Sequence, residues 1–383
     1  TSELSGNVID LCPVGALNSK PYEYTARTWE LRKHESVDVM DAVGSNIRVD
    51  VRGNEVMRIL PRLHEDVNEE WISDKTRFVY DGLKKRRLDR PWVKRDGKLE
   101  ATDWGGAMEA IRARLDGVAG TKIAAIAGDQ ADLEAMAALK DLMGALGSAN
   151  LDCRQDGAKL EGPRSGWLFN TTIAGIEQAD ALLLVGAFPR YEAALVNARI
   201  RKRQRMGGFE IGRIGCPGDL TYPTTDVGAG PQSLVDLLNG EHSFAEVLEA
   251  AERPMVVVGP GAVARPDGAA VLAKAREVAE RFGMIRDDWN GFNVLHAAAG
   301  RVGGLELGLV PGEGGRDVEG ILEGARTGEI EVVYLLGADE IDTRGLENAF
   351  VIYQGSHGDA GARVADVILP GAAYTEKAAT WIN

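Results

Sequence analysis

Five short apolar runs, each ending at a glycine, constrain the fold of this chain more than any other feature. They occupy residues 123–128, 180–186, 255–259, 332–337 and 350–355. Amphipathic helical stretches lie between them, for example at about 132–146 and 193–205. Strands that are apolar throughout and alternate with helices are typical of parallel sheets buried on both faces. We therefore expect a doubly wound α/β fold, whose ligand sites would lie beyond the carboxyl ends of the strands.

Length and charge set further limits on the protein. A chain of 383 residues is too long for one hydrophobic core, so two or three domains are expected. The net charge of −14 disfavours nucleic acid or an anionic membrane surface as a direct partner. No apolar run reaches the roughly 18 residues that span a bilayer, so we expect no direct membrane insertion. Three widely separated cysteines predict a reducing compartment.

The segment before the α/β region is predicted to be β-rich. Residues 47–51 alternate apolar and polar side chains, 52–54 form a turn, and 55–60 return as a second strand. His34 and His64 lie among charged residues without a cysteine nearby, so we do not expect them to bind metal.

Two other motifs have competing interpretations. Gly259-Pro260-Gly261 follows a strand, as in dinucleotide-binding fingerprints, but Pro266 interrupts the helix that should face the pyrophosphate. We favour a simple strand-to-helix turn there. The basic run Lys84-Lys85-Arg86-Arg87 is interpreted as an exposed connector, and a docking strip for an acidic neighbouring protein is the alternative.

The run Leu11-Cys12-Pro13-Val14-Gly15-Ala16-Leu17 contains the candidate metal ligand, Cys12. Cysteine followed by proline is how ferredoxin-type motifs deliver their last cluster ligand. Iron–sulfur clusters select soft thiolates, and proline ends the local hydrogen bonding. A buried structural cysteine is the competing interpretation, and we favour it for Cys216, which follows a strand-like run and precedes Pro217.

Residues 5–21 closely resemble the cluster-binding end of the large iron–sulfur subunit of respiratory complex I, the NADH:quinone oxidoreductase. The resemblance implies that Cys12 is the fourth ligand of a [4Fe-4S] cluster. The other three ligands would lie upstream, because the chain opens at Thr1 within the motif. Further [4Fe-4S] and [2Fe-2S] clusters are implied in the missing amino-terminal part. Other matching stretches are 40–47, 58–62, 170–175, 197–202 and 365–377.

Residues 31–82 resemble the small amino-terminal domain of molybdopterin-dependent oxidoreductases, where four cysteines hold a [4Fe-4S] cluster. The stretches 35–46 and 70–78 contain no cysteine here, so that cluster cannot form. We expect a scaffold and no molybdopterin. The implied domains are the end of a ferredoxin-like cluster domain at 1–22, the β-rich domain at 23–90, and a truncated α/β body of molybdopterin-oxidoreductase type at 91–383.

The resemblance implies an electron-transfer subunit that passes electrons from NADH and flavin through clusters toward quinone, coupled to proton translocation by the whole complex. Its partners would be the flavin-bearing and iron–sulfur subunits of the peripheral arm. It would lie on the cytoplasmic side of the bacterial inner membrane or the matrix side of the mitochondrial one. We expect no substrate-converting site in the chain itself.

Two other functions remain as alternatives. A catalytic molybdopterin oxidoreductase, similar to formate dehydrogenase, shares this type of fold, although the missing cysteines argue against it. A dehydrogenase that binds NAD at Gly259-Pro260-Gly261 is the weaker one. The stretch 150–166, which contains Cys153, is assigned no function.

Overall fold

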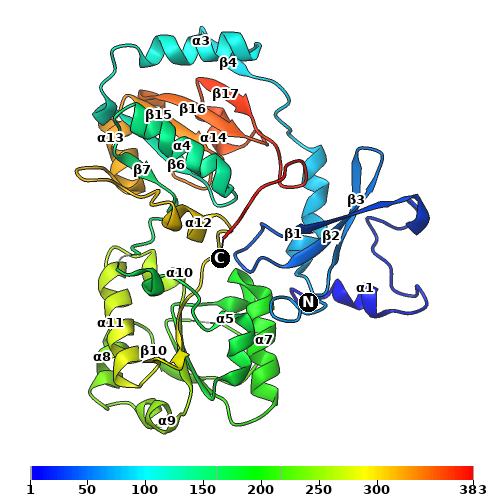
Figure 1. The fold of residues 1–383 in the computed structure, drawn as a ribbon, viewed down its shortest axis with the longest axis vertical. Helices are drawn as coiled ribbons and strands as arrows, with labels where there is room; N and C mark the ends of the chain where they lie inside the picture. Colours follow the sequence, from blue (N-terminus) through cyan, green and yellow to red (C-terminus); the bar gives the residue numbers. More distant parts are fainter. Residues whose placement is uncertain (1, 161, 217, 383) are drawn as a thin grey trace. The chain divides into compact units, whose positions relative to one another are not determined.

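The computed structural model describes residues 2–160, 162–216 and 218–382, which form two compact units (Figure 1). Unit 1 contains the chain up to Tyr80 together with Ala158–Ala297, and unit 2 contains Asp81–Gly157 together with Ala298–Ile382. Each unit is therefore discontinuous in sequence, unlike the consecutive segments 1–22, 23–90 and 91–383, which stay a prediction. Pro217 of the second Cys-Pro pair, and Thr1, Glu161 and Asn383, lie outside the described residues.

The first part of unit 1 is a three-stranded antiparallel sheet. It is formed by β1 (Arg32–Val37), β2 (Asn46–Arg52) and β3 (Glu55–Pro61). The predicted hairpin is confirmed, because Arg52 pairs with Glu55 across a two-residue turn. Gly53 in that turn has a φ of +61°, which favours glycine. The short helices around this sheet are α1 (Asn7–Leu11), η1 (Thr28–Glu30) and α2 (Asp74–Phe78).

The second part of unit 1 is a parallel sheet of five strands. Its strand order is β10-β9-β8-β11-β14, and all four neighbouring pairs are parallel. The strands are β8 (Ala181–Val185), β9 (Glu210–Ile214), β10 (Thr225–Gly228), β11 (Pro254–Val258) and β14 (Phe292–Val294). The remaining small elements of unit 1 are η4 (Arg164–Gly166), α6 (Pro189–Glu192), α10 (Pro260–Val263), β12 (Ile285–Arg286) and β13 (Trp289–Asn290).

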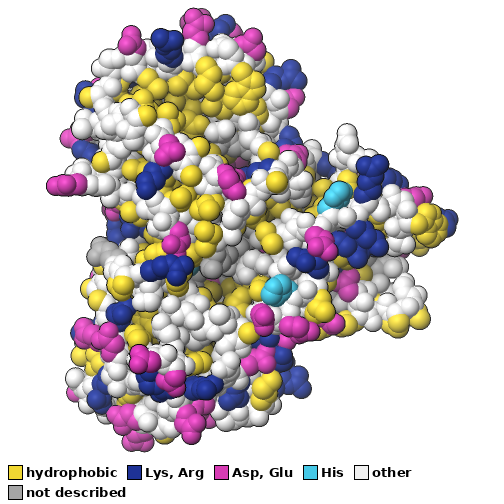
Figure 2. Space-filling view, viewed as in Figure 1, with side chains coloured by type: hydrophobic (Ala, Val, Ile, Leu, Met, Phe, Trp, Pro, Cys, Tyr) yellow, Lys and Arg dark blue, Asp and Glu magenta, His cyan; other side chains and the backbone are white. Residues whose placement is uncertain are grey.

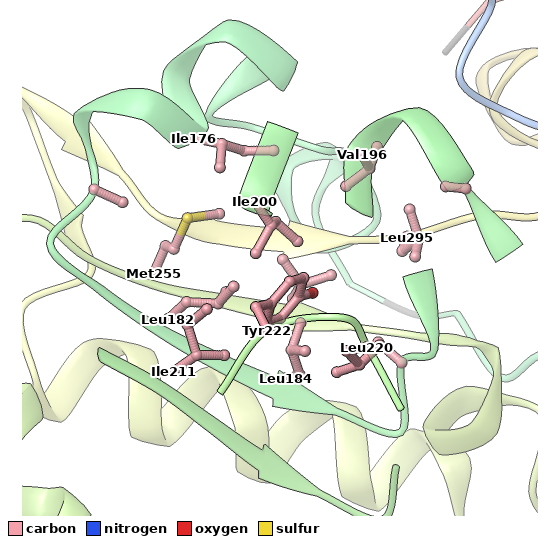
Figure 3. Packing of buried hydrophobic residues seen from close by; sticks show 14 of the residues in the cluster. Ile176, Leu182, Leu184, Val196, Ile200, Ile211, Leu220, Tyr222, Met255 and Leu295 are labelled. Carbon is pink, nitrogen blue, oxygen red and sulfur yellow. The ribbon is translucent and has the colours of Figure 1, made fainter. Parts of the chain in front are cut away.

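Helices cover both faces of this sheet. On one face, Leu182 and Leu184 pack with Ile200 of α7 (Ala194–Arg205), as Figure 3 shows. The segments α5 (Thr172–Gly175) and η5 (Ile176–Gln178) contribute to the same core. On the other face, α11 packs against β11 and against α8. The helices there are α8 (Gln232–Leu238), α9 (Phe244–Ala250) and α11 (Gly268–Arg281).

Unit 2 contains a seven-stranded sheet in the order β5-β4-β17-β16-β15-β6-β7. The five strands from β17 to β7 are parallel, and β4 and β5 form an antiparallel edge. The strands are β4 (Trp92–Arg95), β5 (Lys98–Ala101), β6 (Ile123–Ala127), β7 (Asn150–Asp152), β15 (Val332–Leu336), β16 (Phe350–Gly355) and β17 (Val367–Pro370).

Strand alternation in unit 2 produces one apolar core on each face of its sheet. Ile123, Ala125 and Ala127 of β6 face the core that contains α3 and α4, whereas Ala124 and Ile126 face the core that contains α13 and α14. The helical segments are η2 (Val79–Lys84), α3 (Trp104–Leu115), η3 (Gly120–Lys122), α4 (Leu133–Ala145), α12 (Arg301–Glu306), α13 (Val318–Thr327), η6 (Leu346–Asn348) and α14 (Ala360–Val364).

The predicted doubly wound α/β class is confirmed. The five apolar runs are β6, β8, β11, β15 and β16, and the two predicted helices are α4 and α7. The face visible in Figure 2 shows acidic and basic side chains interspersed over both units.

Candidate metal centre

Cys12 directly follows α1 and caps its carboxyl end in an extended conformation. The thiol is partly exposed and forms no disulfide. Downstream the chain turns at Gly15, whose φ of +68° lies in the left-handed region. A methyl group at Gly15 would meet only Asn18 Oδ1, at 3.8 Å, so there is room for a larger side chain. The left-handed backbone conformation is therefore the reason that this position favours glycine.

Backbone N–H groups of the loop that follows Cys12 lower the pKa of its thiol. Those of Val14 and Leu17 have the largest effect in lowering the pKa of Cys12, and those of Ala16 and Gly15 contribute less. Pro13 has no N–H, so the donors begin at Val14. Amide donors favour the thiolate, which is the form of cysteine that binds metal. Hydrogen bonds to sulfur are also one determinant of cluster potential.

A buried arginine attaches α1 to the β-rich part of unit 1. Arg77 Nη2 donates to Asn7 Oδ1 (3.0 Å) and to Asp10 Oδ2 (2.5 Å), and its side chain is 4% exposed. Asn7 also bonds both the N–H and the carbonyl of Ile72, at 3.2 and 2.8 Å. Gly6 N–H donates to Asp74 Oδ1 at 2.6 Å. The helix before Cys12 is therefore held at several points.

The surface around Cys12 is apolar and open. Val8, Leu11, Val14 and Leu17 are between 48% and 80% exposed. Cys12 also lies in the wall of a groove of about 940 Å³, which Arg27, Arg52, Arg58 and Arg77 help to line. Exposed apolar patches are typical of surfaces that bind another polypeptide. Three of the four arginines are already paired within the chain, Arg52 with Glu30, Arg58 with Asp50 and Arg77 with Asp10.

The other two cysteines are buried and differ chemically from Cys12. Burial raises the pKa of Cys153 to about 12 and that of Cys216 to about 11. Cys216 is 5% exposed within the core of unit 1, which confirms its interpretation as a structural residue. Within 2–160, 162–216 and 218–382, no group of three or more His, Cys, Asp or Glu residues could hold a metal ion. A cluster at Cys12 would therefore need ligands other than these described residues.

The switch point of the unit 1 sheet lies between β8 and β11, where a ligand crevice is expected. The turns that follow these strands are in direct contact, because a methyl group at Gly186 would overlap Ala262 and one at Gly259 would overlap Ala187. The cavity beyond them measures only about 60 Å³, against roughly 300–1,000 Å³ for ligand pockets. The predicted interruption of the helix is confirmed, since α10 ends at Val263 and α11 begins at Gly268.

The switch point of the unit 2 sheet lies between β6 and β15, and it is closed in the same way. A methyl group at Gly128 would overlap the carbonyl of Gly337. Four carboxylates follow the strand ends, and the buried arginine Arg301, at the start of α12, lies beside two of them. Arg301 Nη2 donates to Asp156 Oδ1 at 2.8 Å and lies 4.0 Å from Asp129 Oδ1. The other two carboxylates belong to Asp339 and Glu340, and burial raises the pKa of Asp339 to about 6.

Part of the basic run 84–87 is bound within unit 2. Arg87 donates to both carboxylate oxygens of Glu376, at 2.8 and 2.5 Å. Lys85 pairs with Asp81 and Arg86 with Asp359. These contacts fit the interpretation as a connector, and the docking alternative stays a prediction.

Sequence reasoning proposed Cys12 as a metal ligand, but it did not find the residues that hold the Cys12 loop in place. Asn7 and Arg77 are 70 positions apart, and no local pattern links them. It also overlooked the buried pair Asp38 and Asp41, because residues 31–82 were compared with a pattern of cysteine ligands, in which acidic residues do not appear. The signal available in the sequence was a pair of acidic residues three positions apart within an apolar stretch that contains Val37, Val39 and Val43.

Two family models match the chain. Residues 87–383 match the molybdopterin oxidoreductase model. Residues 31–81 match the model of the NADH-ubiquinone oxidoreductase NDSU1/NuoG-like 4Fe-4S domain.

Curated relatives match the chain over its whole length. The NADH-quinone oxidoreductase G subunit of Rickettsia bellii is 48% identical over 383 residues, which cover 100% of this chain and 55% of the relative. NADH dehydrogenase (ubiquinone) iron-sulfur protein 1, mitochondrial, of Solanum tuberosum is 47% identical, with coverages of 100% and 51%. The chain therefore spans about half the length of the curated relatives it matches.

Among solved structures, the acetylene hydratase of Pelobacter acetylenicus is similar with a TM-score of 0.64 and 12% identity. The match covers 90% of this chain and 64% of that one, and it supports the fold alone. The expected molybdopterin-oxidoreductase type of fold is confirmed. Among the described residues, no helix is long and apolar enough to cross a membrane.

The thiol environments predict selective reactivity of Cys12. In the purified, reduced chain, iodoacetamide should label Cys12 while Cys153 and Cys216 stay protected until the chain unfolds. Because the backbone donors lower the pKa of Cys12, its labelling rate should reach half its maximum below the pH of about 8.5 typical of free cysteine. Peptide mapping by mass spectrometry across a pH series measures both effects.

Gly15→Ala provides the matched variant for this test. It strains the left-handed turn that aims the N–H groups, so the midpoint of Cys12 labelling should move up toward that of free cysteine. A wild-type midpoint at or above about 8.5, or equal labelling of Cys153 in the folded chain, would contradict the description of this loop.

Proposed function

Because the chain belongs to the molybdopterin oxidoreductase family and matches G subunits of NADH-quinone oxidoreductase along its full length, we propose that it is the electron-transfer part of such a protein. The whole protein would carry electrons from NADH and flavin toward quinone in a proton-translocating complex. The observation that carries the proposal is the Cys12 loop, where a partly exposed thiol, whose pKa is lowered by backbone N–H groups, lies beside uncovered apolar residues.

In this function Cys12 is the fourth ligand of a [4Fe-4S] cluster, together with three thiolates from residues upstream of this chain. When bound, the cluster supplies one-electron redox chemistry. The residues of this chain hold and tune the thiolate. The N–H groups of Val14 and Leu17 lower the pKa of Cys12 and so favour its thiolate, and Arg77 fixes the helix before it. The apolar side chains of Leu11 and Val14 would exclude water once covered.

We further propose that the two α/β sheets hold no molybdopterin and contain no substrate-converting site. Both switch points are closed by contact between turns, and the unit 1 cavity of about 60 Å³ is too small for a pterin. In unit 2, the carboxylates of Asp129, Asp156, Asp339 and Glu340 outnumber Arg301 and would repel a phosphate-bearing cofactor. These features argue against the formate dehydrogenase-like alternative.

The proposed partners are the flavin-bearing and iron–sulfur subunits of the peripheral arm. The exposed apolar residues around Cys12 supply a surface for such contacts. The protein would associate with the membrane through these partners, on the cytoplasmic side of a bacterial inner membrane or the matrix side of a mitochondrial one. Clusters of [4Fe-4S] and [2Fe-2S] type would belong to the part of the relatives that precedes this chain.

Cys12→Ala in the full-length protein tests the ligand assignment. Loss of one thiolate should remove or strongly alter one tetranuclear signal in the electron paramagnetic resonance spectrum of the reduced complex. Cys216→Ala is the matched control, because its buried thiol is not expected to bind a cluster, and all signals should persist. An unchanged set of signals in Cys12→Ala would refute the assignment.

Elemental analysis tests the absence of a pterin site. The complex, extracted with detergent from native membranes, should contain iron but no stoichiometric molybdenum or tungsten. Denaturation should release flavin and no fluorescent pterin. One molybdenum or tungsten per copy of the chain would restore the catalytic alternative, and recovery of the full-length protein solely as a free soluble enzyme would contradict the proposed partners.

A further inference from the structure

Residues 31–81 match a 4Fe-4S domain but contain no cysteine. The donors buried between β1 and α2 are carboxylates and hydroxyls, which do not fit an iron–sulfur cluster. We propose that this position binds a hard, oxygen-preferring cation of the alkali or alkaline-earth class. Its ligands would come from Asp38, Asp41 and Ser45 in the loop between β1 and β2, facing the start of α2.

The loop brings Asp38 and Ser45 side by side. The ladder between β1 and β2 ends with Val37 opposite Asn46, and Asp38 N–H continues it by donating to the carbonyl of Ser45 at 2.9 Å. Side chains of directly opposed residues in an antiparallel pair lie on the same face, about 5 Å apart at Cβ. Asp38 is 2% exposed and Ser45 is 1% exposed.

Two oxygen atoms at this position have no hydrogen-bond partner. They are Asp38 Oδ1 and Ser45 Oγ, both buried away from solvent. Leaving a buried acceptor or a buried charge unsatisfied costs several kcal/mol in general. Unpartnered oxygens on neighbouring side chains of one face are what a coordinated cation would satisfy.

The start of α2 supplies further oxygen atoms. Thr76 Oγ1 donates to Asp38 Oδ2 at 2.9 Å, and Ser73 Oγ lies 2.8 Å from Thr76 Oγ1. Ser73 also caps α2 by accepting from Thr76 N–H at 3.1 Å. The other oxygen of Asp38 is therefore held in place, which fixes the direction of Oδ1.

Charge balance points to a cation as well. Asp38 and Asp41 are each 2% exposed, and Asp41 Oδ1 accepts from Val43 N–H at 3.0 Å. The positive charge of Lys75 opposes the rise in the pKa of both carboxyl groups, but its exposed amine donates to the carbonyl of Met40 at 2.6 Å. Two buried carboxylates against one exposed lysine leave negative charge that a bound cation would neutralise. Carboxylate and hydroxyl oxygens are the ligands that such cations prefer.

Cation-dependent stability of the full chain tests the proposal. The chain is dialysed into metal-free choline chloride at pH 8, and K⁺, Mg²⁺ or Ca²⁺ is added at matched ionic strength. At least one of these ions should raise the thermal midpoint by several degrees. Isothermal titration with the same ion should give about one site per chain. Working at pH 8 limits competition from a proton, because burial raises the pKa of Asp38 to about 7.

Variants locate the site. Asp38→Asn should abolish the response to the cation, and its midpoint in choline should match or exceed that of wild type because a buried charge is removed. Ser45→Ala keeps the carboxylates and should weaken cation binding at least several-fold. Glu35→Gln, an exposed carboxylate on β1, is the matched control and should keep the full response.

Either of two results would overturn the proposal. The first is that none of the three ions stabilises the wild-type chain more than choline does. This result includes the case in which Asp38 and Asp41 share a proton, so that stability changes with pH but not with the cation. The second is a cation response that persists undiminished in both Asp38→Asn and Ser45→Ala. These experiments involve neither Cys12 nor a cluster, so they are independent of the proposed electron-transfer function.

Discussion

The hydrogen bonds of Arg77 are the interaction on which the position of Cys12 depends. The guanidinium connects α2 to α1 through Asn7 and Asp10, and Asn7 in turn bonds the backbone of Ile72. An arginine that is almost fully buried is costly to place and strongly destabilising to unpair. The Cys12 loop is therefore held by contacts with α2 and with the backbone of Ile72.

In both α/β sheets, the turns that follow the strands at the switch point are in contact with each other. Gly128 contacts Gly337 in unit 2, and the turns after β8 and β11 contact each other in unit 1, where the cavity beyond them measures about 60 Å³. Fold alone does not determine function, because function lies in the site. In the proposed function the α/β sheets serve as a scaffold, and the redox chemistry would take place at the loop that follows α1.

Much of this structure was predictable from sequence where a residue pattern is local. The apolar runs correspond to β6, β8, β11, β15 and β16, and the resemblance to the complex I protein is confirmed by the curated relatives. Strand β1 was not predicted, because Arg32–Val37 is polar and largely exposed. The anchor between Asn7 and Arg77, and the pairing of Asp38 with Ser45, depend on contacts that only the folded chain creates. The division of the chain into two discontinuous units also depends on such contacts, because parallel pairing joins β6 to β15, which lie far apart in the sequence.

The most direct test of the cluster assignment is an anomalous difference map at the iron edge, measured on crystals of the intact full-length protein or its complex. We expect a cluster of four iron atoms with one iron bonded to Cys12 Sγ, and no iron within residues 31–81. An iron centre that does not contact Cys12, or one enclosed by the loop at residues 38–45, would contradict this assignment.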